Sequence, residues 1–325
     1  MSNKQVFSST FGNLLEKYVE YKRMRGYKFD SGEYDVQQFD IFVTSSAFAT
    51  DKLTKELVEA YITRRPGEKP TTQTHRISTV RCFGKYLVQC GIEAYVLPYG
   101  ILPIVKYGFV PHVLSSEEVA KILVAADSLP NYINSPLRNV VIPMIFRVIY
   151  CCGLRISEAI NLAAEDVDLQ TGVILVRATK FNKDRYVPMA QSLLSKCRFY
   201  ASHVVADMHS KLPFFPSPTE SFYTRTTIGY AFHQCLDIAG IPHYDDGPTV
   251  HSLRHSWAVQ NLVRWENEGK DVNAMLPYLS AYMGHENLLG SERYLRITME
   301  MFPELKKRIS SECSWIMPEV ICNEN

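Results

Sequence analysis

Residues 96–114, VLPYGILPIVKYGFVPHVL, divide the sequence into two parts. They contain three prolines and two glycines and show neither a helical nor a strand period, a composition typical of an extended linker. A chain of 325 residues is also longer than most single domains. We therefore expect a first domain over residues 1–95, a linker over 96–112, and a second domain over 113–325 that ends in a C-terminal tail.

The first domain has helical periodicity. In residues 11–26 one helical face carries only apolar or aromatic side chains, and Gly26 is a plausible stop. These side chains are Phe11, Leu14, Leu15, Tyr18 and Val19. Further helices are expected over 31–46, 53–63 and 71–90, the last capped by Thr71 or Thr72 after Pro70. Four short helices in about ninety residues predict a small bundle.

The second domain combines helices with one β-hairpin. SSEEV at 115–119 has the pattern of a capping box, a long apolar helix is expected over 137–151, and another begins near Ile156 after a turn at Gly153. Residues 172–189 contain two β-rich runs around the polar KFNKD, which predicts a hairpin with a basic tip. The remainder again reads as helix. The predicted fold class is mainly α with a small β-sheet: a helical bundle followed by an α+β domain.

Composition excludes several classes of protein. The eight cysteines include no C-x-x-C pair, which argues against a zinc site or a disulfide framework. The longest apolar stretch, 140–154, is interrupted by Pro143 and Arg147 and is too short to span a bilayer. Residues 1–110 contain 15 Lys and Arg against 11 Asp and Glu, a balance that permits a polyanionic partner. We expect a cytoplasmic protein with reduced thiols.

Six polar side chains with hydrogen-bonding or nucleophilic capacity interrupt otherwise apolar elements of the second domain. They are Arg155, Lys180, His251, Arg254, His285 and Tyr294. Guanidinium groups match phosphate oxygens with paired hydrogen bonds, and a helix entrance adds backbone N–H groups. A phenolic oxygen can attack phosphorus and form a covalent ester. The set therefore indicates phosphoryl chemistry on an anionic ligand.

These residues lie in five short motifs whose order resembles that of the tyrosine recombinases, also called the phage-integrase family. GLRISEAINLAAEDVD (153–168) resembles the first arginine motif, and TKFNKDRYVPM (179–189) resembles the hairpin that carries the lysine. HSLRH (251–255), MGHE (283–286) and RYL (293–295) are similar to the remaining three, with nine residues from His285 to Tyr294. The first domain also resembles, less specifically, the family's core-binding, SAM-like helical bundle.

The resemblance implies a role for each residue. Tyr294 would attack the scissile DNA phosphate and form a 3′-phosphotyrosyl bond, while Arg155 and Arg254 would clamp the non-bridging oxygens. Lys180 would protonate the leaving 5′-oxygen, His251 would assist proton transfer from the tyrosine, and His285 would hydrogen-bond the phosphate. Glu158 matches the family's acidic position and would orient its neighbours. The chemistry implied needs no cofactor, metal or ATP.

Several assignments have alternatives within the sequence. Lys183 lies three residues from Lys180 and competes with it as the hairpin acid. His251 and His255 have the spacing of a metal pair, but the motif lacks the Glu of a zinc-protease helix. We therefore expect His255 to be a structural histidine. Tyr278 and Tyr282 are the competitors of Tyr294.

Cations that suit DNA phosphates occur in both domains. YKRMRGYK (21–28) and TRRPGEKPTTQTHR (63–76) have this pattern in the first domain, although a solvated helix end explains the former equally well. Such contacts position a protein on DNA without specifying sequence. The candidates are Lys22, Arg23, Arg25, Lys28, Arg64, Arg65 and Arg76, with Lys183 and Arg185 in the hairpin.

The expected function is site-specific recombination of double-stranded DNA by a homo-tetramer on two sites, with accessory proteins as further partners. Phage integration, transposition and chromosome-dimer resolution all use this chemistry, and the hairpin favours a mobile element. Two alternatives are a catalytically silent DNA-binding accessory protein and a type IB topoisomerase-like relaxing enzyme. The apolar tail would dock on a neighbouring protomer or on its own domain; in the first case, deletion of 312–325 should weaken synapsis but not single-site binding.

Overall fold

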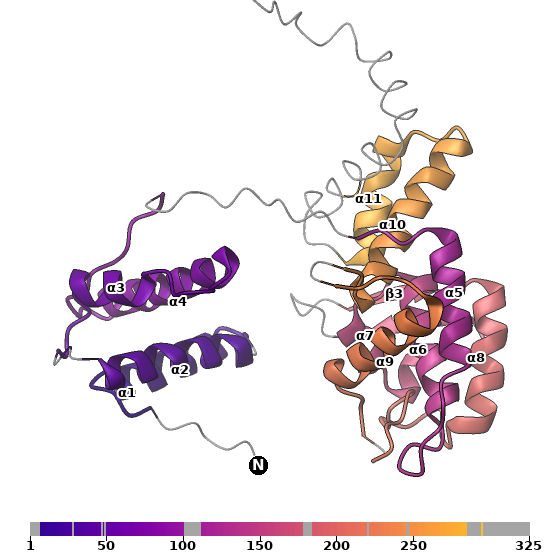
Figure 1. Ribbon diagram of the computed structural model, residues 1–325, viewed down its shortest axis with the longest axis horizontal. Helices are drawn as coiled ribbons and strands as arrows, with labels where there is room; N and C mark the ends of the chain where they lie inside the picture. The colour runs from indigo at the N-terminus through magenta and orange to yellow at the C-terminus, as the bar shows by residue number, and fades with distance from the viewer. Residues whose placement is uncertain are drawn as a thin grey trace, which may run out of the picture. The chain divides into compact units, whose positions relative to one another are not determined.

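The computed structural model describes residues 7–27, 29–46, 48, 50–100, 112–177, 184–219, 221–244, 247–284 and 294. The chain divides into two units, Met1–Phe109 and Val110–Asn325, and Figure 1 shows the elements of each. This division falls inside the predicted linker 96–112, most of which lies outside the described residues. The described part is mainly helical with one small sheet, which confirms the predicted fold class.

The described part of the first unit contains four helices. They are α1 (Gly12–Met24), α2 (Asp30–Ser45), α3 (Lys55–Ile62) and α4 (Pro70–Gln89). Aromatic rings fill the core between them: the ring of Phe39 lies 6.0 Å from that of Phe11 and 5.0 Å from that of Tyr61. The predicted apolar face of the first helix is confirmed, because Phe11, Leu15, Tyr18 and Val19 are all buried.

The predicted threonine caps of the fourth helix are wrong. The helix begins at Pro70, so that Thr71 and Thr72 already lie in its first turn, and the N-cap residue Lys69 makes no side-chain cap. Proline is well suited to the first helical position because its fixed φ is helical and its missing N–H would have no intrahelical partner there. Pro70, which the sequence pattern placed before the helix, is therefore its first residue.

The second unit begins with a helix whose capping box is confirmed. The Ser115 hydroxyl accepts from the Glu118 amide at 3.1 Å, and the Glu118 carboxylate accepts from the Ser115 amide at 2.8 Å. The helices with described bounds in this unit are α5 (Ser116–Asp127), α6 (Arg138–Cys152), α7 (Ile156–Ile160), the 3₁₀ turn η1 (Ala164–Asp166), α8 (Gln191–Val204), α9 (Arg225–Ala239), α10 (Val250–Asn267) and α11 (Val272–Met283).

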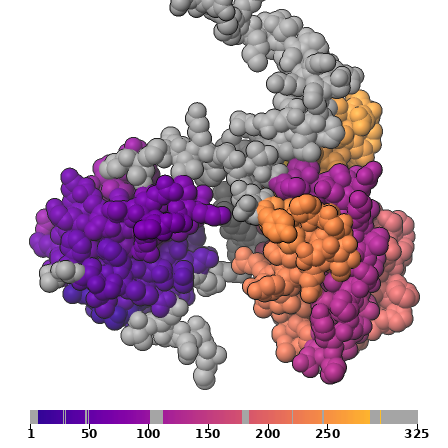
Figure 2. Space-filling model, in the orientation of Figure 1, coloured from indigo at the N-terminus to yellow at the C-terminus, as the bar shows by residue number. Residues whose placement is uncertain are grey.

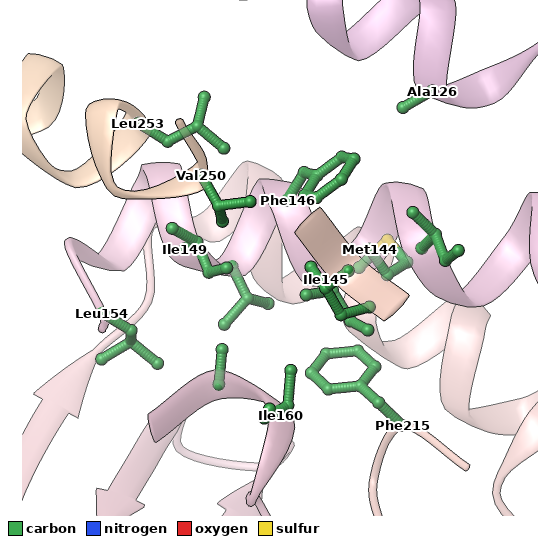
Figure 3. Packing of buried hydrophobic residues seen from close by; sticks show 14 of the residues in the cluster. Ala126, Met144, Ile145, Phe146, Ile149, Leu154, Ile160, Phe215, Val250 and Leu253 are labelled. Carbon is green, nitrogen blue, oxygen red and sulfur yellow. The ribbon is translucent and has the colours of Figure 1, made fainter. Parts of the chain in front are cut away.

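Helix α6 is the centre of this unit and packs against α5, α7, α8 and α10. Its Ile145, Phe146 and Ile149 are buried, and Figure 3 shows them near side chains that include Leu253 of α10 and Phe215. Helix α5 also packs along α9, whose orange atoms lie beside it in Figure 2. A helix that is apolar on several faces is expected at the centre of a core, so α6 is a rigid base for the segment that follows it.

The sheet carries the predicted hairpin. Strands β1 (Val167–Asp168), β2 (Val173–Val176) and β3 (Arg185–Pro188) pair antiparallel in that order. Val173 pairs with Pro188 and Val176 pairs with Arg185, so Arg185 lies at the end of β3 that continues into the hairpin connection. Residues 178–183 of that connection lie outside the described residues.

A separate small core joins α10 to α11. Val259 and Leu262 of α10 pack with Leu279 and Met283 of α11, and the buried ring of Tyr294 belongs to the same cluster. Leu253, on the opposite side of α10, belongs to the main core. Helix α10 therefore contributes side chains to both apolar clusters.

Candidate active site

Arg254 is inside the protein. It lies in the second turn of α10 and is only 1% exposed. Its Nη1 donates to the Gly153 carbonyl, and its Nη2 donates to the Met283 carbonyl at 2.8 Å. A buried guanidinium is stable only when its donors are satisfied, and here two carbonyls from distant parts of the chain perform that task.

Arg155 extends from the turn after α6 toward the same place. Gly153 ends α6 in the left-handed conformation, with φ 56°, and an added Cβ would lie 2.7 Å from the Trp257 ring. This glycine permits the tight turn that places Arg155 at the N-cap of α7. The Arg155 Nη2 donates to the Gly284 carbonyl at 3.0 Å. Arg155 and Arg254 thus bind consecutive carbonyls at the end of α11.

Glu158 joins the two arginines. Its carboxylate accepts from the Arg155 Nη1 at 2.6 Å and from the Arg155 amide at 2.8 Å, and it lies 3.7 Å from the Arg254 Nη1. The structure therefore brings together three predicted site residues, Arg155, Arg254 and Glu158. One carboxylate is therefore the shared counter-ion of two guanidinium groups.

The electrostatics of the cluster are strongly coupled. Burial by itself would raise the pKa of Glu158, but hydrogen bonds and charge from Arg185, followed by those of Arg155, lower this pKa to about 2. Burial and then repulsion by Arg155 lower the pKa of Arg254 to about 10, although Tyr294 and Glu158 act in the opposite direction. At neutral pH the Glu158 carboxylate is ionised and the Arg254 guanidinium is charged.

Tyr294 lies in the wall of this site. Its side chain is 3% exposed, and its hydroxyl is 2.9 Å from Nδ1 of His255. The His255 ring in turn meets the His251 ring edge to face, with centroids 4.4 Å apart. His251 is exposed, so the three rings form a row that runs from the surface to the tyrosine. Among the sequence competitors, Tyr278 is exposed, and the hydroxyl of Tyr282 donates to the Pro188 carbonyl at 3.1 Å.

Four of the predicted site residues cannot be placed. Lys180, Lys183, His285 and Lys28 lie outside the described residues. Described residues flank the segments that contain three of them: Gly284 precedes His285, and Asp184 and Arg185 follow the hairpin segment that contains Lys180 and Lys183.

Arg185 has a position that differs from the sequence expectation of a DNA contact. Its Nη1 and Nη2 donate to the two oxygens of Glu158 at 3.0 and 2.8 Å, and its side chain is 11% exposed. Sequence reasoning missed this pairing because Glu158 and Arg185 are 27 residues apart. Glu158 and Arg185 nevertheless lie in consecutive family motifs, residues 153–168 and 179–189. This order of the motifs is the signal that could have linked the two residues.

The first unit shows which of its cations face outward. Arg76 does not face outward. Its side chain is 8% exposed, pairs with Glu68 at 2.6 Å and donates to the Tyr61 and Thr63 carbonyls. We therefore correct Arg76 from a DNA contact to a structural arginine that joins α3 and α4. The other described candidates of this unit are partly or fully exposed, namely Lys22, Arg23, Arg25, Arg64 and Arg65.

Two features are absent from the described residues. Within the described ranges no group of three or more His, Cys, Asp or Glu side chains could hold a metal ion, and the His251 and His255 pair has no such third member there. No described helix is long and apolar enough to cross a membrane.

Comparison with known proteins places this geometry in a family. Residues 112–301 match the phage integrase family. The chain is 30% identical over 312 residues to integrase/recombinase y4rB of Sinorhizobium fredii, a provisional designation, with 93% of this chain and 97% of that protein covered. It is also 30% identical over 246 residues to tyrosine recombinase XerC of Halalkalibacterium halodurans, with 71% and 72% covered. The chain belongs to the phage integrase family, the tyrosine recombinases.

Solved structures agree on the fold. The Tn1549 transposon integrase, determined in complex with transposon right end DNA, superimposes with a TM-score of 0.63 at 16% identity and covers 89% of this chain and 99% of that one. At this identity the likeness concerns the fold. The mainly helical architecture described above is shared with that integrase.

Proposed function

We propose that this protein is a site-specific DNA recombinase that cleaves and rejoins strands through a 3′-phosphotyrosyl intermediate on Tyr294. One observation carries the proposal: Arg155 and Arg254 share Glu158 and bind adjacent carbonyls, while the residue after Arg254, His255, contacts the Tyr294 hydroxyl. Two arginines and a phenol held in the same unit support this proposal, because attack on a phosphodiester needs donors for the phosphate oxygens and a nucleophile held near them.

The proposed step balances as a transesterification. The Tyr294 oxygen forms a bond to phosphorus while the bond from phosphorus to the 5′-oxygen breaks, and the number of phosphate ester bonds is unchanged. The phenolic proton leaves through the histidine row, and Lys180 gives a proton to the 5′-oxygen. Arg155 and Arg254 stabilise the charge that accumulates on the non-bridging oxygens. Rejoining is the reverse of this step, so no external energy source enters.

Duplex DNA is the proposed substrate, and both units contact it. The exposed cations of the first unit would bind backbone phosphates, a contact that depends on salt. Four protomers on two sites would exchange strands in sequence. The alignments of this chain with two Sinorhizobium fredii proteins cover 97% of each of those proteins, and both are named, provisionally, as integrase/recombinase proteins. We propose that a mobile element carries the present chain.

A suicide substrate tests the chemistry. A duplex nicked close to the cut site loses a short fragment after cleavage, so an active recombinase stays attached to the DNA. We expect a covalent adduct with the wild-type chain and none with Tyr294→Phe, whereas Tyr278→Phe, which alters an exposed tyrosine, should react normally. A wild-type protein that shifts the DNA without forming an adduct would instead be a silent DNA-binding protein.

Mapping bound DNA in cells tests the biological setting. Fragments that coincide with the ends of a mobile element support the proposal. A single bound locus in a region without any mobile element would contradict it and indicate a role such as chromosome-dimer resolution.

A further inference from the structure

We propose that Arg185 is a positioning residue, which fastens the hairpin and the end of α11 to the catalytic arginines through Glu158. This inference rests on the proposed function. It assigns to Arg185 a role in the rate of the chemical step and none in the binding of DNA phosphates.

The contacts of Arg185 use all three nitrogens of its guanidinium. Two of them bind the carboxylate of Glu158 in a paired, parallel geometry, and Nε donates to the Tyr282 carbonyl at 2.9 Å. Paired hydrogen bonds between an arginine and a carboxylate fix orientation as well as distance. The Arg185 guanidinium is held from two sides and is directed into the protein, whereas a DNA phosphate would approach from outside the protein.

The end of α11 shows what this pairing achieves. The carbonyls of Tyr282, Met283 and Gly284 accept from Arg185, Arg254 and Arg155, in that order. The last carbonyls of a helix have no intrahelical donor and form the negative end of its dipole. Three arginines from β3, α10 and the start of α7 therefore hold three consecutive carbonyls, immediately before His285 in the sequence.

Glu158 makes this arrangement possible. Three guanidinium groups in one place repel each other, and Arg155 and Arg185 both lower the pKa of Arg254. The Glu158 carboxylate hydrogen-bonds Arg155 and Arg185 and lies 3.7 Å from Arg254. It is the shared counter-ion of the cluster, and Arg185 is the member that connects it to the hairpin.

The strand and the helix are tied at a second point. The Tyr282 hydroxyl donates to the Pro188 carbonyl at 3.1 Å, so both ends of β3 contact the same residue of α11. The Tyr282 ring also stacks on Trp257 of α10, with centroids 4.9 Å apart. Lys180 is five residues before Arg185, and His285 follows Gly284 in the sequence, so these ties fix described residues that flank the segments of both predicted catalytic residues.

The experiment compares Arg185→Gln with Arg177→Gln in the full-length chain. Arg177 follows β2 on the same hairpin, but its side chain is 51% exposed and pairs with Asp166, so it is the matched control. For each protein we would measure the dissociation constant for a single site at several salt concentrations and the rate of adduct formation at saturating DNA.

We expect Arg185→Gln to lower the saturating adduct rate by about tenfold or more, since small displacements of catalytic groups are costly. Its affinity and the salt dependence of that affinity should stay within twofold of wild type. Loss of a phosphate contact would instead reduce the slope of log affinity against log salt by about 0.9. An unchanged saturating adduct rate would overturn the inference, whether or not the salt slope is reduced.

Two additions separate this inference from other failures. Arg185→Lys keeps the charge but not the paired geometry, so it should fold and still react more slowly than wild type. Hydrogen exchange of the amides of residues 280–284 should be faster in Arg185→Gln and unchanged in Arg177→Gln. If the wild-type chain forms no adduct, the proposed function fails, and the exchange measurement alone decides the role of Arg185. Equal exchange in wild type, Arg185→Gln and Arg177→Gln would reject the positioning role.

Discussion

The hydroxyl of Tyr294 lies 2.9 Å from Nδ1 of His255, and the two rings lie 5.4 Å apart. His255 immediately follows the buried Arg254 in α10, so the helix that places an arginine in the site also orients the tyrosine. With the imidazole proton on Nε2, Nδ1 accepts the phenolic hydrogen. This contact gives the histidine a specific partner, whereas its sequence position predicted only a structural role.

The contact predicts that His255→Phe slows adduct formation about fivefold, because a net hydrogen bond of about 1 kcal/mol helps to orient the nucleophile. His255→Asn, whose side-chain amide reaches a position near that of Nδ1, should lose less. Single-turnover cleavage of the suicide substrate measures both rates. Equal rates in wild type and both variants would show that His255 does not orient Tyr294.

Glu158 predicts a specific dependence of stability on pH. Its pKa is about 2 in the folded protein against an ordinary 4.5, so the ionised form stabilises the fold above pH 4.5. This stabilisation is lost as the pH falls toward 2 and amounts to something on the order of 3 kcal/mol. The difference in free energy of unfolding between wild type and Glu158→Gln should therefore shrink between pH 5 and pH 2. Denaturant titrations at several pH values measure it, and parallel curves would refute the assignment.

Arg254 should be needed for stability as well as for chemistry. Arg254→Met removes the donors to the Gly153 and Met283 carbonyls and one cation near Glu158, which should cost about 3 kcal/mol of the free energy of unfolding. Arg264→Met alters an arginine of the same helix that is 62% exposed, and it should leave stability nearly unchanged. Denaturant unfolding of the two variants provides the comparison. Similar losses in both would mean that the buried contacts do not matter.

Two helix-ending glycines separate backbone strain from the effect on the site. Gly284 and Gly240 have similar φ values, 65° and 67°, but only at Gly284 would an added Cβ meet a neighbour, 2.8 Å from the Arg185 Nη1. Alanine at either position should therefore cost about 1 kcal/mol from the left-handed conformation. Gly284→Ala should also displace Arg185 and slow adduct formation, which Gly240→Ala should not. Thermal unfolding and cleavage rates of both variants test this, and equal cleavage rates would argue against a close fit at Gly284.

Local pattern predicted most of the fold. The apolar face of 11–26, the serine and glutamate at 115–119 and the alternating runs around KFNKD each specify one element through nearby residues. Arg155, Glu158 and Arg254 were also predicted, because their motifs are short and ordered.

Long-range pairing explains what could not be predicted. Arg185 is 97 residues from Tyr282, and His255 is 39 residues from Tyr294. Arg76 looked like one more cation of a basic segment until the fold placed Glu68 and two carbonyls around it. Whether an arginine faces DNA or a carboxylate depends on which elements meet, and a single sequence does not encode that in any local pattern.

One tyrosine of the nineteen in the chain should become linked to DNA. Protease digestion of the trapped adduct, followed by mass spectrometry, identifies the peptide that carries the nucleotide. We predict that the modified residue is Tyr294, joined to a 3′-phosphate. A nucleotide on any other residue, or an adduct that persists in Tyr294→Phe, would contradict the account.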